Sequence, residues 1–333
     1  MGSRIDNLPK AFIWRRLHSL TGLWLVLFLI EHLLTNSQAA LLIGDSGEGF
    51  VRMVNWLHNL PYLTVLEVTL LGVPILIHGI WGIKYALTAK PNSQKGGDRK
   101  PHMKYGRNRA YTWQRITSWI LLVLLVVHVA KFRFIDYPDG VNTGTLTPTY
   151  FVKVQMDPGL YTVAQRLDVK LYDKGDLDEM ARESRSSRSE QALSKVASEI
   201  RAKEETRYSS QNAKILESAQ CAEEKQKLYR ALSSVHLEMG EVVAAATNFG
   251  TASLLTVRNT FKNPIWVAVY TVFVLSACFH AFQGLWTSML TWGWVVKVSA
   301  QAGVRKITIG LMILLAFLGL AAVWGTYFLN LKT

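Results

Sequence analysis

Cysteine is scarce in this sequence: the 333 residues include two, Cys221 and Cys278. The chain has no CxxC, CxxCH or zinc-type spacing, which excludes a covalently attached c-type haem and an iron–sulfur cluster held by this chain. Cys278 lies within an apolar run and Cys221 in a long polar stretch. We therefore expect the two cysteines not to form a disulfide with each other.

Charged residues are rare in five apolar runs of about 20 or more residues, each long enough to cross a bilayer as a helix. The first run is too long for a cleavable secretion signal, and no small-residue cleavage site follows it. We predict an all-α fold: a five-helix transmembrane bundle with a helical extramembrane insertion. The predicted spans are 19–41, 60–87, 112–134, 264–290 and 306–329.

The net charge of +13 is unevenly distributed, and its distribution excludes a nucleic-acid-binding protein. Residues 136–262 contain 17 basic and 18 acidic side chains. The basic excess lies in the N-terminal segment 4–16, the loop 84–115 and the loop 297–306. By the positive-inside rule, this pattern predicts a cytoplasmic N-terminus and a C-terminus on the outer side of the membrane.

The spans divide the chain into three predicted parts. Residues 1–137 would form helices 1–3 of the bundle and residues 263–333 helices 4 and 5. Residues 138–262 would form an outer-face insertion that is mostly helical, with irregular or short extended structure in 138–159.

Within the insertion, apolar residues recur at helical spacing in two places, which favours two amphipathic helices that could form a hairpin. Partial disorder remains the alternative, because residues 184–189 are very polar. Residues 242–255 are rich in small side chains and favour an interfacial helix. The spacing that predicts the two helices comes from Leu193, Val196 and Ile200, and from Leu228, Leu232 and Val235.

Four histidines lie inside four of the five apolar runs: His32, His78, His128 and His280. An ionisable side chain in the membrane is costly and marks a functional site. At 1.5 Å per residue, His32 and His128 lie roughly 20 Å above the inner edge, His78 roughly 9 Å and His280 roughly 15 Å or less. The depths therefore pair His32 with His128 and His78 with His280, which predicts two bis-histidine haem sites on facing helices.

Three further features bear on these sites. Pro74 lies one turn before His78 and should bend its helix and free a backbone carbonyl for a neighbouring helix to satisfy. A zinc site is one alternative to haem, but zinc would need three or four ligands at one level, whereas each level here has two. For a single histidine, the other alternative is a hydrogen bond to a neighbouring helix. Polar residues gather at the inner ends, where haem propionates could emerge: Arg15, Arg16, His18, Gln114 and Arg115.

Two carboxylates lie within the predicted spans. Glu31 adjoins His32, and Glu67 lies about 16 Å above His78 in the outer half of the second span. An acid at that depth could exchange protons between a quinone and the outer aqueous side. A neutral acid that hydrogen-bonds to another helix is the alternative, and Glu67 is the stronger quinone candidate because it lies near the outer surface.

These residues resemble the cytochrome b subunit of succinate:quinone oxidoreductases, in the class with one five-helix chain and two haems (type B). The resemblance covers residues 10–134 and 263–329. The segments that carry it are 15–22 (RRLHSLTG), 28–32 (FLIEH), 73–82 (VPILIHGIWG), 114–117 (QRIT) leading to His128, and 279–286 (FHAFQGLW) through 292–293.

The resemblance implies two b-type haems, a quinone site, and a flavoprotein and an iron–sulfur subunit docked on the cytoplasmic side of a bacterial inner membrane. It assigns His78 and His280 to the inner haem iron, and His32 and His128 to the outer one. Electrons from succinate would reach the quinone through the two haems, or flow in reverse for fumarate reduction; two-haem members more often use menaquinone than ubiquinone. The 138–262 insertion is far longer than the usual connection in this family.

Two other interpretations remain open from the sequence alone. The chain could be the cytochrome b subunit of a hydrogenase or formate dehydrogenase, although the quoted segments fit those families less well. It could also be a non-haem membrane scaffold or transporter whose insertion is the working part.

Overall fold

The computed structural model describes residues 9–41, 46–88, 106–141, 148–186, 194–198 and 210–332. Most of the basic loop expected between the second and third spans lies outside these residues. The described part contains five helices that are long and apolar enough to cross a membrane, which confirms the predicted all-α transmembrane bundle. They are α1 (Lys10–Leu41), α3–η2–α4 (Leu63–Thr88), α5–η3 (Gly106–Ile135), α11 (Pro264–Thr291) and α12–η4 (Val298–Asn330), where η marks a π-helical segment.

The long helices begin and end for local reasons that the sequence contains. Pro264 is the first residue of α11, where a missing N–H costs nothing, and the Asn263 side chain accepts a hydrogen bond from Ile265 N. In α1 and α12 the helix begins about two turns before the predicted span. Arg15 and His18 are consequently part of α1 itself.

A π-helical segment, η2 (Glu67–Gly72), lies directly before α4 (Val73–Thr88), which contains Pro74 in its first turn. The bend at Pro74 stays a prediction. A proline cannot donate to the carbonyl four residues earlier, which here is Leu70. The Trp24 indole of α1 donates a 2.6 Å hydrogen bond to that oxygen. The neighbouring helix therefore satisfies the carbonyl that Pro74 frees, as predicted.

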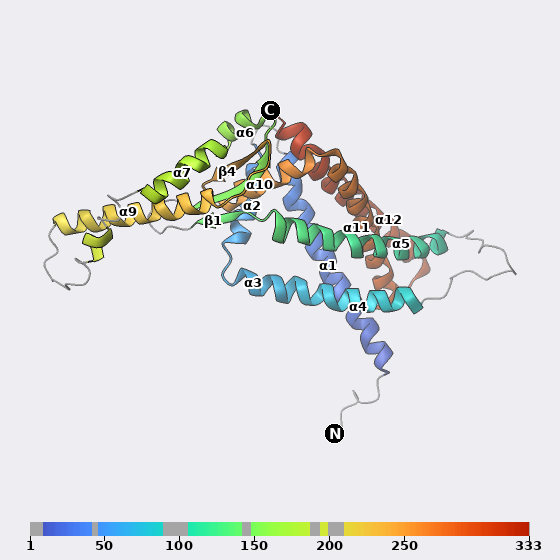
Figure 1. The fold of residues 1–333 in the computed structure, drawn as a ribbon. Coiled ribbons are helices and arrows are strands. Elements are labelled where there is room, and N and C mark those ends of the chain that lie inside the picture. Colours follow the sequence, from blue (N-terminus) through green and yellow to red (C-terminus); the bar gives the residue numbers. More distant parts are fainter. Residues whose placement is uncertain are drawn as a thin grey trace, which may run out of the picture.

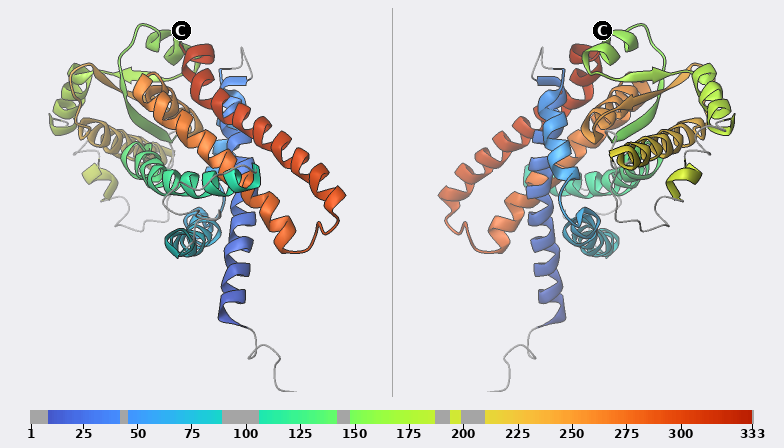
Figure 2. Two further views of the ribbon diagram at one scale, coloured as in Figure 1. Left: turned by 90° about the vertical axis from the view of Figure 1, so that its right-hand side faces the viewer. Right: turned by 90° about the vertical axis from the view of Figure 1, so that its left-hand side faces the viewer.

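Helix α1 is the centre of the bundle (Figures 1 and 2). It packs against α4, α11 and α12–η4, while α11 packs on its other sides against α5 and α12. Helices α4 and α5 make few contacts with each other. The chain folds so that α1 and α11 carry most of the packing, with α4 and α5 on one side of them.

The insertion contains a four-stranded antiparallel sheet. The sequence predicted a mostly helical insertion with short extended structure in 138–159, and it did not predict this sheet. The strand order is β1-β2-β4-β3, and β2 pairs with β4 over six residue pairs from Tyr150↔Ala246 to Gln155↔Glu241. The strands are β1 (Asp139–Val141), β2 (Thr149–Gln155), β3 (Lys170–Tyr172) and β4 (Glu241–Ala246).

The expectation of an interfacial helix at 242–255 is wrong for its first half. Residues 242–246 form β4, which is buried on both faces because it is a central strand, and α10 begins at Phe249. The predicted amphipathic helices are present in part: residues 194–198 are helical, with Leu193 and Ile200 outside the described residues, and Leu228 and Leu232 lie in α9. The helices of the insertion are α6 (Leu160–Arg166), α7 (Lys174–Ser186), α9 (Ser210–Ser233) and α10 (Phe249–Phe261).

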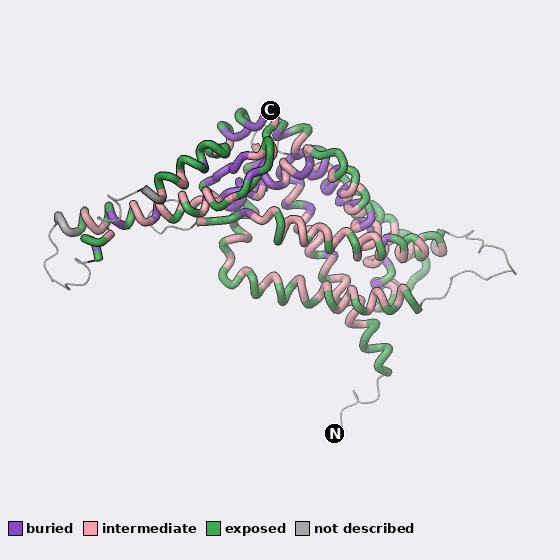
Figure 3. Tube along the Cα trace, in the orientation of Figure 1, coloured by how far each residue is buried: buried purple, intermediate pink, exposed green. Residues whose placement is uncertain are grey.

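The insertion is packed onto one end of the bundle, which we call the insertion end. Helix α2 (Glu48–His58) and α10 pack together there, and one apolar core joins them to the sheet, α6 and the chain end near Leu331. Figure 3 shows buried residues concentrated in this region and along α11, whereas α4 and the N-terminal part of α1 have no continuous buried stripe.

A buried ion pair fixes the insertion to the last span. Arg258, 1 % exposed, donates two 2.7 Å hydrogen bonds to the Asp157 carboxylate and one of 2.6 Å from Nε to the Leu331 carbonyl. Lys262 contacts the same carboxylate at 3.3 Å. Burial by itself raises the pKa of Asp157, but the hydrogen bonds and charge of Arg258, together with Lys262, lower it below its usual value. The sequence analysis did not identify this network.

Candidate functional site

His78 on α4 and His280 on α11 form a pair near the N-terminal end of the bundle. Their ring centroids are 6.2 Å apart and the rings are nearly perpendicular, at 85°. Their Nδ1 atoms lie 3.0 Å from the His18 carbonyl and 3.3 Å from the Gln114 carbonyl, respectively. A carbonyl oxygen only accepts, so each Nδ1 donates and each Nε2 keeps a free lone pair. This is the arrangement that metal-ligating histidines usually have.

His32 on α1 and His128 on α5 form the second pair, closer to the insertion end. Their ring centroids are 5.8 Å apart at 88°. His128 Nδ1 lies 3.2 Å from the hydroxyl of the buried Tyr270 on α11. Aromatic rings surround the pair: Phe28, Phe132 and Phe273 lie within 5.5 Å of one or the other imidazole, centroid to centroid.

The two separations suit a metal held between two imidazoles. With metal–nitrogen distances of about 2 Å on each side, the ring centroids would be roughly 6 Å apart. Among the described residues, no three His, Cys, Asp or Glu side chains gather as a metal site. A porphyrin supplies four nitrogens of its own and asks the protein for two axial ligands, so these pairs fit haem better than a bare ion.

His18 belongs to the first site. Its ring stacks on His78 with centroids 4.1 Å apart and planes at 10°, and Tyr85 lies edge-on to it at 5.4 Å. Gly22 makes the approach possible: a Cβ at that position would lie 2.8 Å from His78 Cε1. The position of His18 beside His78 is compatible with the propionate contact that the sequence predicts.

Polar side chains next to this site have hydrogen-bonding groups that no described residue satisfies. They are His18 Nδ1, Gln114 Oε1 and Arg115 Nε, all buried. Gln114 Nε2 donates to the His280 carbonyl at 3.0 Å and Arg115 Nη2 to the Ala86 carbonyl at 3.0 Å, so both side chains are held in place. Arg15 lies three residues before His18 and is exposed. The two nitrogens, His18 Nδ1 and Arg115 Nε, can donate hydrogen bonds and suit the carboxylates of a haem b. Gln114 Oε1 only accepts.

The two candidate carboxylates lie in different surroundings. Glu31 is exposed, and its carboxylate accepts a 2.8 Å hydrogen bond from Thr35 one turn later in α1. Glu67, at the start of η2, forms a 2.9 Å ion pair with Arg133 of η3. The structure thus brings Glu67 to a partner on another span at the insertion end, and it leaves Glu31 with a contact inside its own helix.

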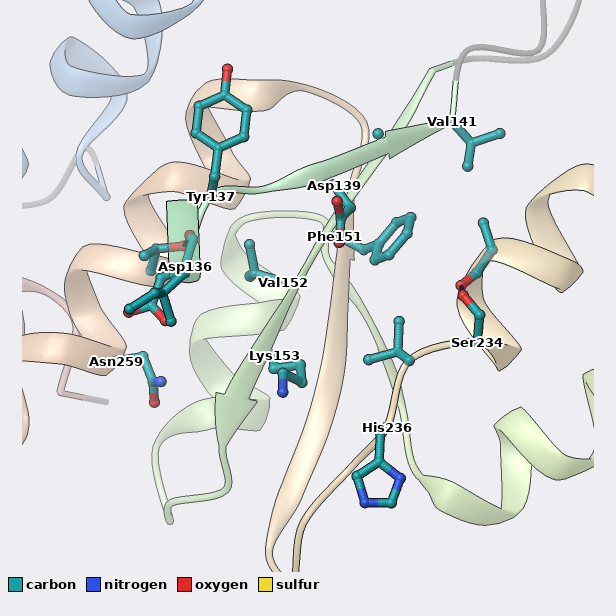
Figure 4. A pocket seen from close by; sticks show the side chains of 15 residues that line it. Asp136, Tyr137, Asp139, Val141, Phe151, Val152, Lys153, Ser234, His236 and Asn259 are labelled. Atoms are coloured by element: carbon teal, nitrogen blue, oxygen red, sulfur yellow. Dashed lines mark hydrogen bonds between the residues drawn. The ribbon is translucent and has the colours of Figure 1, made fainter. Parts of the chain in front are cut away.

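A hollow of about 480 Å³ lies within the insertion, between the sheet, the end of η3 and the segment after α9 (Figure 4). Asp136, Lys153, His236 and Asn259 are among its polar lining residues. None of the predicted site residues lines it.

Two residues of these sites were not identified from the sequence. Tyr270 lies ten residues before His280 in the same apolar run, and its depth near His128 was the available signal. The other residue is His58, whose ring stacks on Phe249 of the insertion at 3.8 Å. Phe249 is 191 residues away in the sequence, so no local pattern could indicate this contact.

One similar protein supports the resemblance that the histidine segments indicated. The chain is 34% identical over 125 residues to the succinate dehydrogenase cytochrome b558 subunit of Bacillus subtilis (strain 168). The match covers 37% of this chain and 56% of that protein, so the chain spans about half the length of the relative it matches. No family model matches the chain, and no solved structure matches it.

Proposed function

We propose that this chain is the di-haem cytochrome b membrane subunit of a succinate dehydrogenase, and that it connects succinate oxidation on partner subunits with a membrane quinone. The observation that carries the proposal is the presence of two histidine pairs on facing helices, at 6.2 and 5.8 Å between ring centroids. The similarity to the Bacillus subtilis cytochrome b558 subunit supports it independently.

Each histidine pair would hold one haem b through its Nε2 atoms. When bound, a haem with two histidine ligands supplies one-electron transfer and leaves no open coordination position for oxygen. The carbonyls of His18 and Gln114 orient His78 and His280, and the Tyr270 hydroxyl orients His128. The two carbonyl contacts fix the tautomers of His78 and His280 and make these imidazoles stronger bases.

The residues at the N-terminal end would bind propionates of the inner haem. Arg115 and His18 have buried nitrogen atoms available for this, and Arg15 stands one turn earlier on α1. The same end would face the cytoplasm and bind the flavoprotein and iron–sulfur subunits. The basic residues of the first and last spans support that orientation, by the positive-inside rule.

The quinone would bind near the outer ends of the second and third spans. There Glu67 would exchange protons with the quinone oxygens. Glu67 is preferred over Glu31 because it lies beside Arg133 and close to the aqueous surface at the insertion end. We expect the quinone to be menaquinone, in a bacterial inner membrane whose outer face carries residues 138–262.

The test is the visible spectrum and haem content of the complex purified through this chain. We expect a reduced b-type absorption band, two haems per chain, two redox potentials, and a co-purifying flavin-containing subunit. A preparation without the b-type band would overturn the cytochrome assignment. Two haems with no flavoprotein partner would favour another quinone-linked oxidoreductase.

A further inference from the structure

Six side chains from three distant parts of the sequence form one contact cluster at the insertion end, which we call the outer cluster. Arg133 pairs with Glu67 and lies over the Tyr137 ring at 4.5 Å. Tyr137 contacts Phe249 at 5.1 Å, and Phe249 stacks on His58 at 3.8 Å. The members are His58, Glu67, Arg133, Tyr137, Tyr150 and Phe249, of which the last two belong to the insertion.

His58 is held in one orientation by residues of the insertion. Its ring is nearly parallel to that of Phe249, at 9°, and Tyr150 lies edge-on to it at 5.7 Å and 89°. Its Nδ1 is buried and has no hydrogen-bond partner among the described residues. The side chain is still partly accessible, so one part of the imidazole faces the protein and another can reach water.

The groups that act electrostatically on His58 come from the ends of two spans. Burial lowers the pKa of His58, the Arg133 charge lowers it further, and the Glu67 carboxylate partly offsets both. Tyr150 and Tyr137 are the other titratable groups of the cluster, and burial raises the pKa of Tyr137. The pKa of His58 is therefore held below its usual value, and a change of charge on Glu67 or Arg133 would shift it.

Arg133 has two interactions of different kinds. Its guanidinium pairs with Glu67 at 2.9 Å and also lies over the Tyr137 ring. When Glu67 becomes protonated, the ion pair is lost but the cation–π contact remains. Arg133 can thus stay in place while Glu67 alternates between its charged and neutral forms.

We infer that the 138–262 insertion positions His58 as a proton-exchange residue for Glu67, so that the quinone site draws its protons from water on the insertion side. This inference rests on the proposed function. Reduction of a quinone by the two electrons from succinate adds one proton to each quinone oxygen. Each proton that Glu67 gives up is replaced from His58 through water between the two side chains. His58 donates from one ring nitrogen and takes a proton from water at the other.

The test uses the intact complex in proteoliposomes, with succinate as donor and a naphthoquinone as acceptor. In His58→Ala we expect quinone reduction to fall roughly tenfold, since water replaces the relay only partly. Added imidazole should restore the rate in a dose-dependent manner by occupying the space beside Phe249. A membrane-impermeant pH dye on the insertion side should report proton uptake that slows and recovers in parallel.

Two further variants make the result specific. In a His58→Ala, Phe249→Leu double variant, imidazole should no longer restore the rate, because the stacking surface is lost. His236→Ala is the matched control: this histidine is exposed in the insertion and outside the cluster, so its rate and pH profile should equal those of the unchanged complex.

Three outcomes would overturn the inference. They are an unchanged rate and pH profile in His58→Ala, a loss of rate that imidazole does not restore, and proton uptake from the opposite side of the membrane. Failure of the unchanged complex to reduce quinone with succinate would instead count against the proposed function. Haem reduction by succinate, recorded first for each variant, separates the two cases.

Discussion

Helices α4 and α5 differ from α11 and α12 in how they are held. In the most apolar windows of the second and third spans no residue is buried, whereas 33% and 28% of the residues are buried in those of α11 and α12. The first pair is anchored by single polar contacts, such as Trp24 to the Leu70 carbonyl and Arg115 to the Ala86 carbonyl. The second pair is anchored by close packing, for which Gly319 and Gly325 leave room.

The comparison teaches that the bundle has a closely packed half, which we call the packing half, and a half with more free surface. We call the second the binding half because we expect its free surface to hold the haems. Two of the four predicted haem ligands, His78 and His128, lie on the sparsely packed helices, and each faces a partner on α11 or α1. A helix that binds a flat prosthetic group contacts that group over part of its surface, and this part is not available for packing against another helix. We therefore expect changes in the two halves to have different consequences, and the predictions follow in order of effect.

The largest effect is expected from the two histidines predicted to bind the inner haem. His78→Ala or His280→Ala should each remove one haem per chain and block succinate-to-quinone activity, because the inner haem would lose one of its two histidine ligands. Haem content per chain and the reduced spectrum measure this. Loss of activity with both haems retained would contradict the assignment, and His236→Ala should keep both haems.

Arg258→Leu should be the most harmful change in the packed region. It leaves the Asp157 carboxylate buried without its main partner, which costs about 3–5 kcal/mol. We expect a lower thermal unfolding midpoint and faster proteolysis of the insertion, while the haem spectrum is retained. The double variant Asp157→Leu, Arg258→Leu should recover part of the stability, and a double variant less stable than the single one would argue against this account.

Two glycines allow the halves to be compared by the same substitution. Gly319→Ala places a Cβ 2.6 Å from Val274 Cγ1 and should destabilise the packed half by about 1–3 kcal/mol. Gly22→Ala displaces His78 instead and should change the spectrum or potential of the inner haem at nearly unchanged stability. Gly79→Ala, with open space around its Cβ, is the control. Equal losses of stability in Gly22→Ala and Gly319→Ala would argue against the distinction between the packing half and the binding half.

A smaller effect is expected from pH. The folded-state pKa of Asp157 is lowered, so its ion pair stabilises the fold above the unfolded-state pKa and this contribution is lost as the pH falls through the folded-state value. Because of Asp157, unfolding midpoints should therefore not change with pH near neutrality and should decline in acid. Asp157→Asn should be less stable at neutral pH and should show a weaker decline.

The smallest effect is expected at the surface. Arg52 and Glu48 form an ion pair at 3.9 Å with both side chains more than half exposed. Arg52→Ala should change the free energy of unfolding by less than about 0.5 kcal/mol. A shift as large as that of Arg258→Leu would show that exposure does not separate the two pairs.

The sequence predicted the parts of the fold whose information is local. Apolar length fixed the five spans, and helical rise paired the four histidines by depth, in agreement with the two ring pairs in the structure. The haem roles of those histidines, and of Arg15, His18 and Arg115, stay predictions. The roles of Glu31 and Glu67 likewise stay predictions.

The insertion could not be predicted in the same way. Strand β4 contains Ala244, Ala245 and Ala246, and alanine favours a helix unless tertiary pairing overrides it. Its partner β2 lies about 90 residues earlier, so the pairing is not visible in any short window. The Asp157–Arg258 pair and the His58–Phe249 stack join segments just as distant, and their residues carry no motif.

The bond from Arg258 to the Leu331 carbonyl has a consequence for how the protein is made. Arg258 precedes the last two spans, whereas Leu331 follows them, and Asn330 in turn donates to the Ala39 carbonyl of the first span. This junction closes after the final helix has entered the bilayer. The insertion therefore reaches its final fold only after the last span, α12–η4, has been made. In a ribosome-bound chain that ends before this span, the Arg258 guanidinium would lack one of its acceptors, and proteases and chaperones could detect the incomplete insertion.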